Sequence, residues 1–413
     1  MTKEELTIIC ENARAAAFGL TDADLRYKIL DTLANMLQSS CQEITDANAL
    51  DIQNARENGV SESMIDRLML NFDRINAIAN AVREVNSLPD PLKCDEVIER
   101  PNGLVIKKQR VPMGVIGMIY EARPNVTVDA AALAIKSGNA IILRGGKEAL
   151  LTNLAIVKVI QEALLACGVS KDAVYLFTDT SHKSAEILMK LRGHLDLLIP
   201  RGGKRLINTV VENSTVPVIE TGAGNCHVYI EKSADFDMAI KILYNAKTSR
   251  VSVCNAAESL LIDEEIAKDL LPKIKNALDE KSVELRGCPK TCQILGDIKP
   301  ATDEDFYTEY NDYILSIKVV SNYKEAIEHI NTHNTKHSEA IISTDERAIS
   351  YFMEHTDAAA LYVNASTRFT DGGEFGLGAE IGISTQKLHA RGPFALDALT
   401  TTQYRVFGCG QVR

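Results

Sequence analysis

The chain has 413 residues, of which 46% are hydrophobic and 24% charged, and these are the proportions of a globular protein. Asp and Glu number 56 against 45 Lys and Arg, so the net charge of −11 argues against nucleic acid as a partner. No apolar run approaches the roughly 18 residues that a membrane-spanning helix needs.

The N-terminal segment and the cysteines predict a cytoplasmic protein. The first residues, MTKEELTIICENARAAA, contain acids early and lack the basic-then-apolar order of a signal peptide. The nine cysteines are scattered along the chain, which favours reduced thiols over a disulfide framework. We therefore expect no membrane association.

Residues 1–93 are expected to be helical, because apolar residues recur at helical spacing in Tyr27–Leu37 and Ile65–Val82. Three prolines then interrupt the pattern. The alternating stretch Leu104–Val111 follows, and it predicts an exposed two-stranded ribbon of the kind that pairs at sheet edges between subunits.

From Val111 the pattern changes to short apolar strands that alternate with longer helices. The predicted strands are Gly114–Tyr120, Ala140–Leu143, Val174–Phe177, Leu195–Ile199 and Pro217–Glu220, and the predicted helices are Val126–Ser137, Leu150–Ala166, Ser184–Leu191 and Lys204–Glu212. This alternation predicts an α/β fold with a mostly parallel sheet. A second α/β segment follows over residues 234–363.

The sequence RGGK occurs twice, each time between a predicted strand and a predicted helix. The first copy is Arg144, Gly145, Gly146 and Lys147, and the second is Arg201, Gly202, Gly203 and Lys204. Paired glycines let a ligand approach the backbone, and a helix N-terminus attracts anions. Ordinary turn chemistry would use the same residues. Two copies at adjacent strand ends favour a dinucleotide or an acyl phosphate that binds across both.

Two further residues are candidates for catalysis. Cys254, in RVSVCNAAESLL, precedes a helix-like pattern, and a helix N-terminus would stabilise its thiolate. A buried structural cysteine is the alternative. Glu220 ends a predicted strand before TGAG, where it is a candidate general base or an ordinary strand-end carboxylate.

Two patterns suggest a metal site, and we expect neither to hold one. Cys288 and Cys292 are spaced too widely for a zinc knuckle, and no second pair follows. His329, His333 and His337 would share one face of a continuous helix, but the residues around His333 are poor helix formers.

Several segments resemble the aldehyde dehydrogenase superfamily, in the same order along nearly the whole chain. They are VPMGVIGMIYEARPN, GNAIILRGGKEA, IETGAGNCHVYI and SRVSVCNAAESLL. The segment VSNYKEAIEHINTHNTKHSEAII is similar to a signature of the branch that acts in proline biosynthesis. The resemblance implies an α/β protein with a Rossmann-type cofactor domain, an α/β catalytic domain and a small β oligomerisation arm.

The resemblance also implies domain boundaries. We expect a cofactor-binding domain over residues 1–99 and 113–233, to which residues 364–395 return. The catalytic domain is expected over residues 234–363 and carries Cys254. The arm, residues 100–112 and 396–413, is expected to pair across a subunit interface in a homo-oligomer.

Site residues follow from the same resemblance. Cys254 is implied as the nucleophile, and Asn125 as the side-chain amide of its oxyanion hole. Arg144 falls where hydrolytic members have a lysine near the cofactor ribose. Glu309 matches a glutamate that holds the nicotinamide ribose, and Glu220 matches the base that activates water in hydrolytic members.

Other positions are implied to bind the cofactor phosphates and the substrate. Gly202 and Gly203 match the turn near the cofactor pyrophosphate. Arg250, Ser366 and Arg368 fall where the superfamily lines its substrate tunnel, and they are candidate anchors for an amino-acid head group.

The implied reaction is NADPH-dependent reduction of L-glutamyl 5-phosphate to L-glutamate 5-semialdehyde through a Cys254 thioester. RGGK replaces a Lys-Pro-x-Glu turn, which removes an acid near the ribose and favours NADPH over NADH. We expect a small-molecule substrate and a transient contact with a separate glutamate 5-kinase chain. Two alternatives stay open: a hydrolytic NAD(P)-dependent aldehyde dehydrogenase, and a catalytically inactive scaffold member.

Overall fold

The computed structural model describes residues 2–413, apart from the side chains of Ser63 and Lys204, and the chain divides into two compact units. Unit 1 comprises Met1–Thr221, Gly376–Gly382 and Phe394–Arg413, and unit 2 comprises Gly222–Phe375 and Ile383–Pro393. The first boundary therefore lies at Thr221 rather than at the predicted residue 233. Most of residues 364–395 belongs to unit 2, whereas the prediction placed this segment with the cofactor-binding domain.

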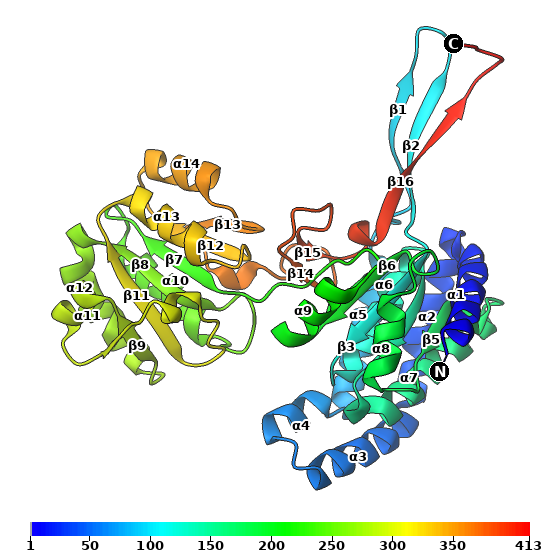
Figure 1. Cartoon of the computed structure of the whole chain (residues 1–413), viewed down its shortest axis with the longest axis horizontal. Helices are drawn as coiled ribbons and strands as arrows, with labels where there is room; N and C mark the ends of the chain where they lie inside the picture. Colours follow the sequence, from blue (N-terminus) through cyan, green and yellow to red (C-terminus); the bar gives the residue numbers. More distant parts are fainter. Residues whose placement is uncertain (1) are drawn as a thin grey trace. The chain divides into compact units, whose positions relative to one another are not determined.

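Helices form the N-terminal part of unit 1. They are α1 (Lys3–Ala17), α2 (Ala23–Ser39), α3 (Cys41–Glu57), α4 (Glu62–Leu68) and α5 (Phe72–Ser87) (Figure 1). The predicted helix Ile65–Val82 is in fact two helices. The Asn48 side chain of α3 binds the backbone of Leu68 and Leu70, and the Asn71 side chain caps α5, so the chain turns between α4 and α5.

A four-stranded parallel sheet forms the centre of unit 1, with strand order β5-β4-β3-β6. Its strands are β3 (Val115–Tyr120), β4 (Ala140–Arg144), β5 (Val174–Leu176) and β6 (Leu197–Arg201), and the helices after them are α6 (Pro124–Lys136), α7 (Leu150–Ala166), α8 (His182–Met189) and α9 (Lys204–Asn213). The predicted strand Pro217–Glu220 does not form, and only Val218 makes an isolated bridge, to Leu198.

One helical stretch, Lys147–Ala166, is long and apolar enough to cross a membrane by length and composition alone. This differs from the expectation that no segment would reach that length. The apolar residues of α7 are largely buried in unit 1, where the helix packs against α2, α3 and α6. On its outer side, Lys158 forms an ion pair with Glu43 of α3. The stretch therefore has the features of a core helix.

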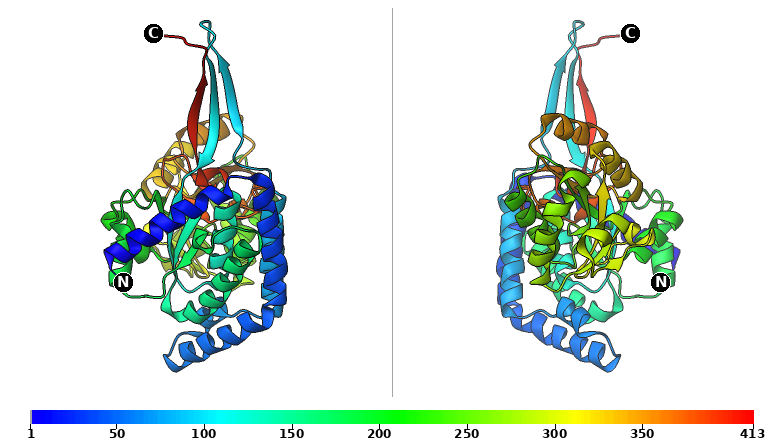
Figure 2. Two further views of the ribbon diagram at one scale, coloured as in Figure 1. Left: turned by 90° about the vertical axis from the view of Figure 1, so that its right-hand side faces the viewer. Right: turned by 90° about the vertical axis from the view of Figure 1, so that its left-hand side faces the viewer.

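Three antiparallel strands make up the arm of unit 1: β1 (Cys94–Glu99), β2 (Val105–Pro112) and β16 (Thr400–Phe407), in the order β1-β2-β16. Figure 2 shows the arm projecting from the helices of unit 1. The ribbon predicted at Leu104–Val111 is therefore the middle strand of three. The C-terminal segment pairs with it inside one chain, with Thr400 opposite Pro112 and Phe407 opposite Val105.

Unit 2 contains a seven-stranded parallel sheet with the order β10-β9-β11-β8-β7-β12-β13. The strands are β7 (Cys226–Ile230), β8 (Ala257–Asp263), β9 (Glu284–Gly287), β10 (Lys299–Pro300), β11 (Ile314–Val320), β12 (Ser338–Ile342) and β13 (Ala360–Val363), and the helices are α10 (Phe236–Thr248), α11 (Glu264–Asp279), α12 (Pro289–Leu295), α13 (Tyr323–His333) and α14 (Glu346–His355). β14 (Gly382–Ser384) and β15 (Gly392–Phe394) form a separate two-stranded sheet.

Alternate residues of the unit 2 strands face different helices. Val228 and Ile230 of β7 pack in one apolar cluster with α10 and α11, whereas Tyr229 packs in another with α13 and α14. Both faces of the sheet are thus covered, which explains why its strands read as continuous apolar runs.

A buried ion pair joins α10 to the start of β8. The Lys247 ammonium lies 2.5 Å from Glu258 Oε2, and both side chains are fully buried. The Asn311 backbone N–H donates to the other carboxylate oxygen of Glu258, at 3.1 Å. Burial raises the pKa of Glu258 to about 7 and lowers the pKa of Lys247, so each group depends on its partner to stay charged.

We expect Lys247→Met to lower the free energy of unfolding by about 3–5 kcal/mol, because it leaves the buried Glu258 carboxylate without its cation. The double variant Lys247→Met/Glu258→Leu should lose much less, because it removes both charges. Urea unfolding followed by circular dichroism measures both. A double variant less stable than the single one would contradict this account.

Candidate active site

The two RGGK turns lie at the carboxyl ends of β4 and β6 in unit 1, and β3 runs between those strands. The prediction of adjacent strand ends was therefore wrong by one strand. As a result, the end of β3 and the segment that follows it, Glu121–Asn125, lie between the two turns. Crevices at the carboxyl ends of parallel strands are the usual ligand sites of such sheets.

The first turn holds Arg144 firmly. Its Nη2 donates to the carbonyl oxygens of Thr180, at 2.5 Å, and Ser181, at 3.2 Å. Its Nε is buried and has no hydrogen-bond partner among the described residues, and burial lowers the pKa of Arg144. The guanidinium is thus fixed in direction and keeps a donor available, whereas Lys147 is exposed.

Close packing explains the first glycine of this turn, because a Cβ on Gly145 would lie 2.6 Å from Asn153 Nδ2. At Gly146 the nearest atom is the movable Glu148 carboxylate, and a Cβ there would lie 3.3 Å from the Ala122 backbone nitrogen. The helix that follows is already capped, because the Asp51 carboxylate accepts from the backbone N–H groups of Leu151 and Thr152. An anion would therefore find this helix N-terminus occupied.

The second turn differs, because no side chain caps α9 at its N-cap residue, Gly203. The Gly203 N–H instead donates to Glu121 Oε1, at 3.1 Å. Arg201, at the end of β6, is half-buried, and the side chain of Lys204 lies outside the described part of the chain. Backbone N–H groups and nearby positive charge make this turn suited to an anion.

Asn125 lies in the first turn of α6, and its Nδ2 donates to Asp129 Oδ2, at 3.1 Å. Burial raises the pKa of Asp129 to about 6, and the Asn125 hydrogen bond and the Arg201 charge act against that rise. Sequence reasoning did not identify Asp129, although its position four residues after Asn125 on a helix was a usable signal. Glu220 is half-buried in an irregular segment, and burial raises its pKa.

Cys254 lies in unit 2, in the loop between α10 and β8. The prediction that a helix follows it was wrong, because residues Ala257–Asp263 form a fully buried strand. A buried parallel strand and a buried helix segment have similar apolar sequences, which explains the error. No helix that directly follows Cys254 therefore stabilises its thiolate.

The backbone around Cys254 is packed against Gly224. A Cβ on Gly224 would lie 1.4 Å from the Cys254 carbonyl oxygen, so only glycine fits. The Gly224 N–H donates to Glu309 Oε1, at 2.8 Å, and Cys226 Sγ donates to the Cys254 carbonyl oxygen, at 3.2 Å. Glu309 is thereby brought close to the Cys254 loop.

Asn255 connects Cys254 to the predicted substrate loop. Its Nδ2 donates to the carbonyl oxygens of Arg368 and Thr370, and its own carbonyl oxygen accepts from the Thr367 hydroxyl at 2.7 Å. The Arg368 guanidinium in turn donates to Asn255 Oδ1. Asn255 was not predicted, although it is the next residue after the candidate nucleophile.

Arg368 lies within electrostatic range of both Arg250 and Cys254. Burial lowers the pKa of Arg368, and the charge of Arg250 lowers it further, whereas Cys254 acts in the opposite direction. The Ser366 hydroxyl accepts from the Arg368 backbone N–H, at 3.3 Å, and orders this turn. Arg250 is exposed, and no ion pair within the described residues involves it. The pair offers positive charge to an anionic ligand near the thiol.

The histidine-rich segment contacts the Arg368 loop through a hydrogen bond between the Ser338 and Thr370 hydroxyls. His337 Nδ1 and Thr370 Oγ1 lie 2.8 and 2.7 Å from the Ser338 hydroxyl. His329 stacks on His333, with ring centroids 3.9 Å apart. Burial lowers the pKa of His337 to about 4 and that of His329 to about 2, so both are neutral near pH 7. The buried histidines act here as packing and hydrogen-bonding groups.

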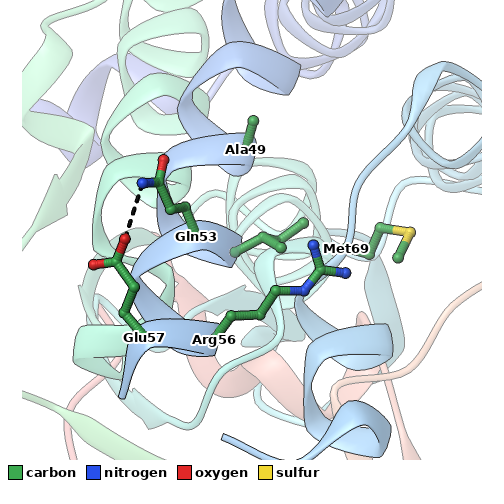
Figure 3. A pocket seen from close by; sticks show the side chains of 6 residues that line it. Ala49, Gln53, Arg56, Glu57 and Met69 are labelled. Atoms are coloured by element: carbon green, nitrogen blue, oxygen red, sulfur yellow. Dashed lines mark hydrogen bonds between the residues drawn. The ribbon is translucent and has the colours of Figure 1, made fainter. Parts of the chain in front are cut away.

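The described residues form a surface pocket of about 400 Å³ beside α3 (Figure 3). Its lining residues are Ala49, Ile52, Gln53, Arg56, Glu57 and Met69. Gln53 donates to Glu57 across one helical turn, at 2.9 Å. None of the residues predicted for catalysis or binding lines it, so this pocket is not the candidate active site.

Comparisons with known proteins agree with this arrangement. The family model described as "Aldehyde dehydrogenase family" matches residues 1–293. A gamma-glutamyl phosphate reductase of Clostridium perfringens is 54% identical over 412 residues and covers 99% of both chains. One of Ligilactobacillus salivarius is 56% identical over 413 residues, again over 99% of both.

Solved structures give the same result. The crystal structure of a gamma-glutamyl phosphate reductase from Thermotoga maritima matches with a TM-score of 0.97 and 48% identity, over 99% of this chain and 100% of the other. A propionaldehyde dehydrogenase from Rhodopseudomonas palustris, at 16% identity and a TM-score of 0.70, shares the fold over 98% of this chain and 97% of its own.

Proposed function

Because the chain belongs to the aldehyde dehydrogenase family, and within it to the gamma-glutamyl phosphate reductases, we propose that it reduces L-glutamyl 5-phosphate to L-glutamate 5-semialdehyde and phosphate, the second step of proline biosynthesis from glutamate. The observation that carries the site assignment is the Cys254 loop. Gly224 and Asn255 hold it in place, and Arg368 lies within electrostatic range of its thiol.

Cys254 acts as the nucleophile in this proposal. Its thiolate attacks the C5 carbonyl carbon, and the Asn125 amide and a backbone N–H stabilise the oxyanion; such a donor contributes about 3 kcal/mol. The bond from C5 to the phosphate oxygen then breaks, the leaving phosphate takes up one proton from solvent, and a thioester remains on Cys254. NADPH, when bound, supplies the hydride that reduces this thioester. Cleavage of the C–S bond releases the aldehyde and restores the thiolate.

Arg368 and Arg250 bind the carboxylate of the substrate's amino-acid head. Arg368 is held by Asn255 and by the Ser249 hydroxyl, which accepts from its Nε at 3.0 Å. An arginine fixed in this way loses little side-chain entropy when it pairs with a carboxylate. Its link to Asn255 also couples substrate binding to the position of the Cys254 loop.

The residues of unit 1 fit a nicotinamide dinucleotide. The orphaned Nε of Arg144 and the exposed Lys147 suit a ribose 2′-phosphate, which favours NADPH over NADH. Arg201, Gly202 and Gly203, with the N-terminus of α9, suit the pyrophosphate. Glu309 of unit 2 is assigned to the nicotinamide ribose by the resemblance.

A hydrolytic dehydrogenase is the second candidate, and it depends on Glu220 as the base that activates water. Burial raises the pKa of Glu220, and this direction strengthens a carboxylate as a base, so the choice between the two candidates does not rest on it. It rests on the reaction, because an acyl phosphate reductase must exclude attack by water on its thioester. We therefore assign no proton transfer to Glu220.

The arm is proposed as the oligomerisation element. Tyr404, Val406 and Phe407 of β16 are more than half exposed, an unusual concentration of large apolar side chains on one strand. We propose that the arm contacts another copy of the chain. A cytoplasmic location and a transient contact with glutamate 5-kinase stay predictions from the sequence.

The reverse reaction tests the chemistry directly. Reduction of NADP+ by glutamate 5-semialdehyde should require inorganic phosphate, because phosphate must cleave the Cys254 thioester, and Cys254→Ala should lower the rate at least 10⁴-fold. The change in absorbance at the NADPH band measures both. Cys292→Ala, a half-buried cysteine of α12, is the matched control and should keep its activity. An equal rate without phosphate would instead indicate the hydrolytic enzyme.

Removal of the substrate anchors should raise the Michaelis constant. Arg250→Ala and Arg368→Ala are each expected to raise KM for the semialdehyde about tenfold or more, because a charged hydrogen bond to the carboxylate is lost. Arg347→Ala on α14 removes the same charge from an exposed position and should have no effect. Initial rates over a range of substrate concentrations measure KM and kcat. An unchanged KM would remove that arginine from the substrate site.

Cofactor preference should depend on Arg144. Arg144→Met is expected to lower the ratio of kcat/KM for NADPH to that for NADH about tenfold, because a charge beside the 2′-phosphate is lost. A general loss of structure would lower both values and leave their ratio unchanged. A constant ratio would therefore show that Arg144 does not contact the 2′-phosphate.

A further inference from the structure

Glu121 occupies the second RGGK turn, although nothing in the sequence marked it as a site residue. It follows β3 directly, and its backbone N–H donates to the Arg201 carbonyl oxygen at 3.2 Å. Its side chain then lies across Gly202. A Cβ on Gly202 would be 2.6 Å from Glu121 Cδ and 2.9 Å from Oε1. A Cβ at residue 202 would therefore have to displace the Glu121 side chain.

The Glu121 carboxylate is bound where an anion is expected. Oε1 accepts from the Gly203 N–H at 3.1 Å, at the start of α9, where no other side chain forms a cap. The N-terminal end of α9 carries partial positive charge, which stabilises a carboxylate or a phosphate alike. One backbone N–H cannot donate to both at full strength, and two anions at this distance repel each other.

The contact is also easy to break. The Glu121 side chain is exposed, and none of the ion pairs within the described residues involves it. Rotation about its side-chain bonds would move the carboxylate into solvent and free the Gly203 N–H. The first turn shows the contrast, because there Asp51 is buried and its carboxylate is held by three donors from Leu151 and Thr152.

We propose that Glu121 is an affinity-determining residue that holds the pyrophosphate subsite of the second turn when no cofactor is bound. The inference rests on the proposed function, because it assigns this turn to a dinucleotide. The Glu121 carboxylate substitutes for a phosphate group on the Gly203 N–H, and the cofactor must displace it on binding. Its presence lowers affinity for the cofactor and favours release of the oxidised form after hydride transfer.

The test is direct binding of NADPH and NADH without substrate, measured by the change in nicotinamide fluorescence and by titration calorimetry. Glu121→Ala and Glu121→Gln should each lower Kd about two- to fivefold, with the larger gain for Ala, because Gln still accepts a hydrogen bond but carries no charge. The gain should be equal for NADPH and NADH, since both contain the pyrophosphate. Glu212→Gln, at the opposite end of α9, removes the same charge and should leave Kd unchanged.

The outcomes separate this inference from the proposed function. Wild-type protein that binds neither NADPH nor NADH would overturn both. Wild-type protein that binds NADPH, with equal or weaker binding in the Glu121 variants, would overturn the inference alone, since weaker binding would make Glu121 a ligand of a cofactor hydroxyl. A gain of the same size in Glu212→Gln would also overturn it, because the effect would then be one of net charge.

Discussion

The candidate site of unit 2 depends on one steric constraint, the contact between the backbone of Gly224 and the Cys254 carbonyl group. No side chain fits at residue 224, because its Cβ would overlap the Cys254 carbonyl oxygen. The contact fixes Cys254 against the segment that leads into β7, and Glu309 and Cys226 reinforce it from either side. The Asn255 side chain then connects this backbone to Arg368 through hydrogen bonds. The backbone of Cys254 is thereby held by several contacts although it lies in a loop.

Much of the fold could be predicted from local pattern. Most strands and helices of unit 1 follow from apolar runs and helical spacing, although the predicted strand Pro217–Glu220 does not form and a distant side chain divides one predicted helix. Asn48 breaks the predicted helix at Leu68 from twenty residues away, and no local signal at Leu68 records this contact. The strand after Cys254 was misread for another reason, since burial on both faces removes the alternation that identifies a strand.

The candidate site was predictable where family motifs carry it, and not where packing does. Cys254, Asn125 and the RGGK turns lie in recognisable segments. Three other residues belong to the candidate site only because of hydrogen bonds that the sequence does not reveal, namely Asp129, Asn255 and Glu121. The histidine signature lies between these cases. Its residues were noticed as a pattern, but their neutral, buried state becomes clear only from the hydrogen bonds of His337 and the stacking of His329.

The pairing of β16 with β2 has a consequence for biosynthesis of the chain on the ribosome. β2 emerges early, but its partner strand is translated only after the whole of unit 2. Until then β2 has an open hydrogen-bonding edge, which is the type of surface on which nascent chains misassociate. The charged side chains of Lys107, Lys108 and Arg110 along β2 discourage such pairing by mutual repulsion. The charges of β2 thus reduce the risk of wrong pairing until β16 has been translated.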